Sequence, residues 1–127
     1  MLLRADTQRI EIDVTDPGWC RCWLYDGANR IYLGAETSRY IQSHLLDGLE
    51  NNPEKIAGII NGEEVYWILS LEEAHHTLYC TVSNEDKILF WQDKYAKIIS
   101  EIKLPAEKVN EWIDQLRALN DNTIDSA

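Results

Sequence analysis

The spacing of hydrophobic residues divides the chain into short strands and two helices. Ile10, Ile12 and Val14 alternate with charged residues, which is the pattern of a strand with one buried face. Comparable segments follow it, separated by turn residues such as Asp16-Pro17-Gly18 and Asn61-Gly62. The pattern predicts strands at residues 9–14, 19–25, 30–33, 56–60, 64–71, 77–82, 87–92 and 97–103.

Two segments have helical spacing instead. The first follows the capping hydroxyls of Thr37 and Ser38 and ends at Asn51-Asn52-Pro53. The second begins at Pro105. Its apolar stripe is Val109, Trp112, Ile113, Leu116 and Leu119, and that of the first helix is Ile41, Leu45, Leu46 and Leu49. The order β-β-β-α-β-β-β-β-β-α predicts an α+β fold, in which about seven or eight strands form a mainly antiparallel, strongly twisted sheet with both helices on one face.

The length of 127 residues predicts a single domain, which we place at residues 1–119, followed by a polar C-terminal tail at 120–127. The segments 23–49 and 91–116 each contain a strand, a turn, a second strand and a helix. This is either a structural pseudo-repeat or the recurrence of a simple pattern, and because their sequence identity is negligible we favour the recurrence.

Alternation within the predicted strands assigns residues to the two faces of the sheet. The core face, beneath the helices, comprises Ile10, Ile12, Val14, Cys20, Cys22, Leu24, Ile31, Leu33, Val65, Trp67, Leu69, Leu78, Cys80, Val82, Ile88 and Phe90. The opposite face comprises Trp19, Trp23, Tyr25, Tyr32, Tyr66, Ile68, Tyr79, Leu89 and Trp91.

The opposite face is more apolar than a solvated sheet face usually is, so something should cover it. Three covers are open: the sheet curls on itself, a second copy of the chain packs there, or a different protein binds. Tyrosine and tryptophan are enriched at interface hot spots. We therefore expect the partner-binding residues to be Trp23, Tyr32, Tyr66, Tyr79 and Trp91.

The run Ser70-Leu-Glu-Glu-Ala-His-His-Thr-Leu-Tyr-Cys80 concentrates the residue types that bind metals or move protons. In a strand, four residues separate His76 and Cys80 by ~13 Å, so the two cannot ligate one ion directly. We expect residues 72–76 to form a solvated connection between two strands. Cys20, Cys22 and Cys80 are expected in the core, since free cysteine is among the most buried residue types. We predict no catalytic residue, no cofactor and no metal, because no nucleophile, phosphate-loop or zinc signature occurs.

Charge bears on the kind of partner that the chain binds. Twenty-two acidic residues and twelve lysines and arginines give a formal net charge of -10, which opposes binding to nucleic acid and to anionic membranes. A basic protein is the expected partner, with self-association as a homodimer as the other possibility. The longest apolar runs are too short to span a bilayer, and three cysteines without a secretory signal favour reduced thiols in the cytoplasm.

Three hypotheses for function follow. The first is a small acidic cytosolic inhibitor or protein-binding protein without catalysis of its own, of the immunity-protein type, which neutralises a basic partner such as a nuclease toxin. The second is an enzyme or small-molecule-binding domain with a pocket between sheet and helices. The third is a structural homodimer joined through the aromatic face.

Overall fold

A computed structural model describes residues 1–16, 18–50, 58–60, 62–83 and 86–119. The first half consists of four strands and a helix: β1 (Leu2–Ala5), β2 (Gln8–Asp16), β3 (Trp19–Asp26), β4 (Asn29–Thr37) and α1 (Ser38–Glu50). Thr37 caps α1, because its Oγ1 accepts a hydrogen bond from the backbone N–H of Tyr40 at 3.2 Å. The predicted end of this helix at residues 51–53 lies outside the described residues.

The second half consists of five strands and a helix: β5 (Gly58–Ile60), β6 (Glu63–Ser70), β7 (Thr77–Ser83), β8 (Asp86–Gln92), β9 (Ile98–Leu104) and α2 (Ala106–Leu119). The predicted helical stripe of α2 is confirmed, since all five of its residues are buried. The α+β class is also confirmed. The described residues form nine strands, however, because β1 was not predicted; its Leu3 and Ala5 are buried and flank the exposed Arg4. The predicted tail, residues 120–127, lies outside the described part of the chain.

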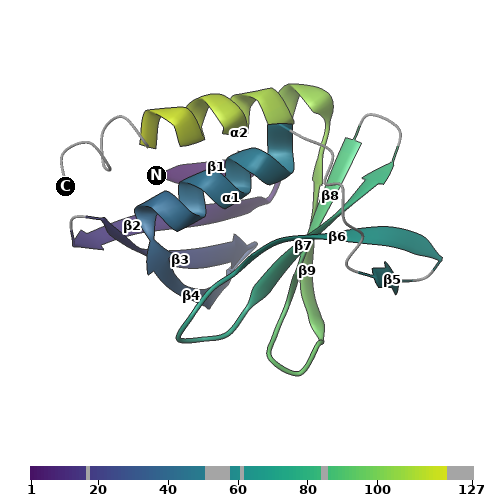
Figure 1. Cartoon of the computed structure of the whole chain (residues 1–127), viewed down its shortest axis with the longest axis horizontal. Coiled ribbons are helices and arrows are strands. Elements are labelled where there is room, and N and C mark those ends of the chain that lie inside the picture. The colour runs from purple at the N-terminus through teal and green to yellow at the C-terminus, as the bar shows by residue number, and fades with distance from the viewer. Residues whose placement is uncertain (17, 51–57, 61, 84–85, 120–127) are drawn as a thin grey trace.

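The strands form two sheets and not the single sheet that was predicted. Their orders are β1-β2-β3-β4 and β5-β6-β7-β8-β9, and every pairing is antiparallel. The helices lie side by side along one side of the molecule, with the two sheets below them (Figure 1). One buried cluster contains residues from both sheets and both helices, so the halves share a core.

The two sheets meet at a loop that connects β6 to β7. Glu72 in this loop exchanges two backbone hydrogen bonds with Ala35 of β4, at 3.0 and 3.1 Å. Gly34 permits the approach, since its φ is +128° and a Cβ there would lie 2.8 Å from the Leu71 Cβ and still closer to the Glu72 carbonyl oxygen. We call residues 71–76 the docking loop. The prediction of a connection here is confirmed, but the loop is not merely solvated, because it joins the sheets.

The predicted faces are correct for most of the N-terminal sheet and partly wrong for the C-terminal one. Ile10, Ile12, Cys20, Cys22, Leu24 and Leu33 are buried in the shared core as expected, whereas Val14 is 40% exposed. In the second sheet the core contains Leu69, Leu78 and Cys80 as expected, together with Ile68, Leu89 and Trp91, which were assigned to the opposite face. Trp67 and Val82, assigned to the core, are each 42% exposed.

Two features of the strands explain these errors. A register shift between Trp67 and Leu69 interrupts the alternation of β6. In β8 the run Ile88-Leu-Phe-Trp91 is apolar on both sides, so alternation carries no signal there. Pairing decides the faces instead: Trp91 lies opposite Leu78 and Leu89 opposite Cys80, so these four share the core face.

The two halves have the same order of elements, an antiparallel meander followed by a helix. Helix α1 begins at Ser38, fifteen residues after Trp23, and α2 begins at Ala106, fifteen residues after Trp91. Each half also has a register shift beside its tryptophan, between Cys22 and Trp23 and between Trp91 and Gln92. The two halves therefore share the order of their elements, but Trp23 lies on the outer face of its sheet and Trp91 in the shared core.

Both helices lie on the surface of this two-sheet body and carry charged residues on their outer sides. Within the described residues, neither helix has the length and apolarity that crossing a bilayer requires.

Candidate functional site

Aromatic residues on the outer face of the N-terminal sheet are covered by arginine side chains of the same sheet. The Arg30 guanidinium lies 3.7 Å from the centre of the Trp23 ring, and that of Arg9 lies 4.2 Å from the centre of the Tyr25 ring. The rings of Trp23 and Tyr32 are themselves 4.7 Å apart. These cation–π contacts shield part of the Trp23 and Tyr25 rings, which are half-buried.

Tyr32 connects this face to the docking loop. Its hydroxyl donates a hydrogen bond to the Glu73 carboxylate. Burial, followed by this hydrogen bond, raises the pKa of Tyr32 to about 12, so the phenol stays protonated at neutral pH. The loop is also held by His76, whose Nδ1 lies 3.2 Å from the Leu33 carbonyl oxygen of β4. The polar residues that first suggested a metal or proton-transfer site thus attach one sheet to the other.

His76 should make stability depend on pH near neutrality. Burial lowers the pKa of His76 below its ordinary value of 6.5, so between the two pKa values the unfolded state binds more protons than the folded state. The free energy of unfolding therefore has its full value above pH 6.5 and decreases as the pH falls from 6.5 towards the lower pKa of folded His76. Between pH 7.5 and 5.5, urea unfolding should show a smaller decrease in the free energy of unfolding for His76→Gln than for the unmodified protein. The exposed His75 supplies the control, because His75→Gln should lose as much unfolding free energy over this range as the unmodified protein. An equal decrease in His76→Gln would show that His76 does not cause the pH dependence.

The three cysteines are buried thiols in the core. Burial raises the pKa of Cys80 to about 11 and raises those of Cys20 and Cys22 as well. Neutral, buried thiols are poor nucleophiles and poor metal ligands. Among the described residues, no three histidine, cysteine or acidic side chains gather as a metal site would require.

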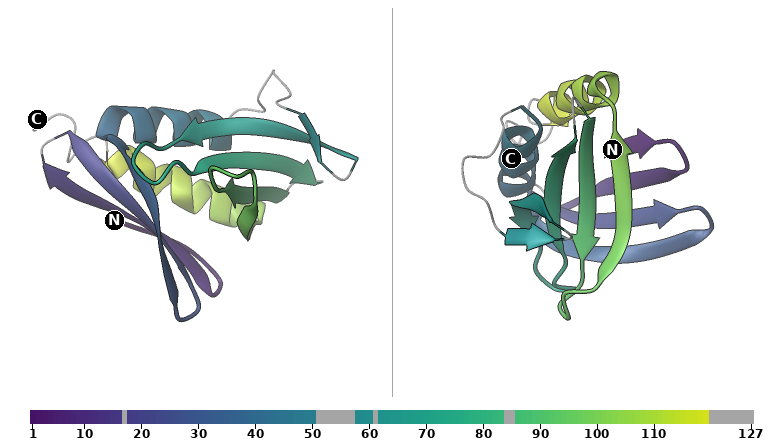
Figure 2. Two further views of the ribbon diagram at one scale, coloured as in Figure 1. Left: turned by 90° about the horizontal axis from the view of Figure 1, so that it is seen from below. Right: turned by 90° about the vertical axis from the view of Figure 1, so that its right-hand side faces the viewer.

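On the outer face of the C-terminal sheet, Val65, Thr81 and Phe90 are buried (2%, 7% and 4% exposed), whereas Ile98 is 38% exposed. No helix lies in front of β6–β9 in the right-hand view of Figure 2. Tyr79 and Phe90 stack on this face with ring centres 5.5 Å apart. Beside them is a depression of about 120 Å³, lined by Val65, Thr81, Ile88, Phe90 and Ile98 and by the carboxylates Glu63 and Glu101. We call this depression and Tyr79 the outer apolar face.

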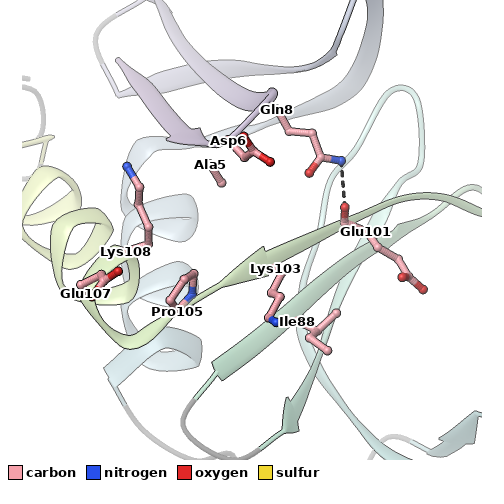
Figure 3. Close-up of a pocket in the computed structure, with 9 residues that line it drawn as sticks. All are labelled: Ala5, Asp6, Gln8, Ile88, Glu101, Lys103, Pro105, Glu107 and Lys108. Atoms are coloured by element: carbon pink, nitrogen blue, oxygen red, sulfur yellow. Dashed lines mark hydrogen bonds between the residues drawn. The ribbon is translucent and has the colours of Figure 1, made fainter.

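A groove of about 690 Å³ continues from this face, since Ile88 and Glu101 line both. It lies between the β1–β2 turn, β9 and the start of α2, as Figure 3 shows. The Gln8 side-chain amide crosses it and donates hydrogen bonds to the Glu101 carbonyl oxygen at 2.8 Å and the Ser100 hydroxyl at 3.0 Å. The remaining lining residues are Ala5, Asp6, Lys103, Pro105, Glu107 and Lys108.

The charges of this groove are unevenly paired. Its two lysines form ion pairs with acids outside the lining, Lys103 with Asp86 at 3.5 Å and Lys108 with Glu111 at 2.9 Å. Within the described part of the chain, Asp6, Glu101 and Glu107 have no ion pair. The groove and the outer apolar face therefore form one concave surface with unpaired negative charge, which can attract a cationic group.

The five aromatic residues predicted to bind a partner do not form one surface. Trp23 and Tyr32 lie on the N-terminal sheet, and Tyr79 lies on the outer apolar face. Tyr66 hydrogen-bonds to Glu64 at 2.9 Å, and Trp91 is only 2% exposed. The prediction of a common aromatic face is wrong, because two separate sheets carry these residues.

Sequence reasoning also missed the groove. Asp6 and Gln8 lie in the groove because they are at the turn between β1 and β2. This turn was not predicted, since β1 was not predicted. The alternation of Leu3, Arg4 and Ala5 was the available signal. No known protein-family model matches this chain, and a search of curated proteins found no match either.

Proposed function

We propose that this protein is a small acidic binding or inhibitor protein that docks a basic protein partner on the outer apolar face and the adjoining groove. The observation that carries this proposal is the depression flanked by Glu63 and Glu101, which no helix covers. It joins apolar contact area to negative charge, the combination that a cationic protein surface complements. The partner would be of the kind that an immunity protein neutralises, such as a basic nuclease toxin.

The exposed apolar residues that the structure describes lie mostly in the second half of the chain. Among the described residues, six large hydrophobic side chains are exposed, and five belong to the second half of the chain: Ile59, Trp67, Val82, Tyr95 and Ile98. The sixth is Val14. Of these six, Ile98 lines the depression and adds exposed apolar contact area to the proposed surface. The buried free thiols agree with the reducing cytoplasm as the place where the protein acts.

Affinity capture from native lysate tests this function. A double variant, Glu63→Lys with Glu101→Lys, reverses both carboxylates of the depression, and Asp13→Lys with Asp16→Lys reverses two exposed carboxylates on β2. The unmodified protein and the β2 variant should retain a basic protein that the first variant loses. Association should slow as salt rises, because a Debye length of ~8 Å at physiological ionic strength screens the attraction.

Two results would contradict the proposal. Capture of the same proteins by the Glu63→Lys, Glu101→Lys variant would show that binding does not use this surface. An association rate independent of salt would show that the charge of -10 serves solubility alone.

A small-molecule ligand is the second candidate function, and the groove favours it. Its volume of about 690 Å³ suits a compact ligand, and the Gln8 amide and the Lys103 and Lys108 amines are polar groups at its walls. Thermal-shift screening of a metabolite library would test it. An increase in melting temperature that Gln8→Ala abolishes would support this function over a protein partner.

A further inference from the structure

Two of the four sheet edges, those of β1 and β4, are covered by the chain itself. Along the outer edge of β1, the Trp112 indole N–H donates to the Arg4 carbonyl oxygen at 2.9 Å, and the Gln115 amide donates to that of Leu2 at 3.2 Å. The docking loop covers β4 through the Ala35–Glu72 pair. Covered edges cannot template another strand, so the protein protects these two against pairing with other chains.

The outer edge of β9 is different. Among the described residues, Gln8 alone hydrogen-bonds to this edge, and its bond shows that the Glu101 carbonyl points away from β8. In an antiparallel pair, residues two apart direct their backbone groups to the same side, so Lys103 also points its N–H and C=O outward. Among the described residues, neither backbone group of Lys103 has another partner. Glu101 and Lys103 both line the groove, so this open edge forms one of its walls.

We propose that the edge of β9 binds an extended, basic segment of the partner as an additional strand of the C-terminal sheet. This inference rests on the proposed function and specifies how the partner engages the groove. A backbone N–H of the incoming strand replaces the Gln8 amide as the donor to the Glu101 carbonyl oxygen, and its other backbone groups pair with the N–H and C=O of Lys103.

The dimensions and charges of the groove favour a single peptide strand. From Glu101 to Pro105 the edge spans ~13 Å, which matches about four residues of an extended chain. The β1–β2 turn forms the opposite wall of the groove. The unpaired carboxylates of Asp6, Glu101 and Glu107 favour lysine or arginine in the segment, alternating with residues of high strand propensity on the other face.

A displayed library of random ten-residue peptides, selected on the full chain, tests this mode of binding. We expect the selected peptides to alternate basic with β-branched residues and to slow hydrogen exchange at the amide of Lys103. Lys103→Pro removes this outward N–H without breaking the pairing to β8, and should weaken binding at least about tenfold. Lys103→Gln loses the same charge but keeps the N–H, so it should bind as the unmodified protein does.

A second measurement holds even if Lys103→Pro fails to fold. A selected peptide with alternate amides N-methylated keeps its side chains but loses backbone donors, and it should no longer bind the unmodified protein. Equal binding of the N-methylated peptide, or a library that yields no binder, would overturn the added strand. If the Glu63→Lys, Glu101→Lys variant still loses its partner in that case, the proposed function stands and only this mode of binding is wrong.

Discussion

Gly34→Ala should lower the free energy of unfolding by roughly 3–5 kcal/mol. The φ of +128° at Gly34 lies in a region that residues with a Cβ rarely adopt. A Cβ would also meet the Glu72 carbonyl and the Leu71 Cβ, so the docking loop would have to move away from β4. The loop would then lose both hydrogen bonds between Ala35 and Glu72. Urea unfolding monitored by circular dichroism measures the effect.

Gly27→Ala is the matched control for this substitution. Gly27 also has a positive φ, +59°, but nothing lies within 4 Å of an added Cβ, so the change should cost only about 1–2 kcal/mol. Hydrogen exchange at the amides of Ala35 and Glu72 should accelerate in Gly34→Ala alone. Similar costs for the two variants would show that backbone strain, and not the contact between the sheets, accounts for the loss.

The elements that could be predicted from sequence are those in which a single face is buried. The stripe of α2 and the alternation of Ile10 and Ile12 each place apolar residues at one period, so both segments were identified correctly. Most of the N-terminal sheet's core followed from the same alternation. Local periodicity sufficed there because burial was one-sided.

The division into two sheets could not be predicted in this way. It depends on Gly34 and the docking loop, which lie far apart in the sequence and make backbone contacts that leave no hydrophobic pattern. The core face of β8 could not be predicted either, since both faces of its apolar run are equally hydrophobic. Only the pairing of Trp91 with Leu78 shows which face is buried.

The type of the candidate site was predicted from the sequence, but its position was not. Negative charge and a surplus of apolar residues indicated a protein-binding surface, and both properties follow from composition. Its position did not follow, because the groove brings Gln8 beside Glu101, more than ninety residues later in the chain. The contacts of Arg9 and Arg30 with the aromatic rings of the N-terminal sheet could not be predicted either, because they depend on how the strands pair.

Trp91→Ala should destabilise the protein by about 3–5 kcal/mol, the cost of removing a large side chain from a packed core. Trp91 is 2% exposed and lies among residues of both sheets and both helices. The sequence left open whether this residue binds a partner, in which case the same change would leave stability almost unaltered. Its position in the shared core predicts the opposite result, and chemical denaturation measures it.

Conservative variants of two buried tryptophans test the environment of Trp91 more closely. The Trp112 indole N–H donates to the Arg4 carbonyl, whereas that of Trp91 has no hydrogen-bond partner among the described residues. Both changes to Phe remove ring area, but only Trp112→Phe leaves a backbone carbonyl without its donor. Trp112→Phe should therefore cost more than Trp91→Phe, by about 1–3 kcal/mol. Equal costs would mean that the Trp91 N–H is satisfied in solution, for example by a buried water, and that the core around it is more polar than its apolar neighbours indicate.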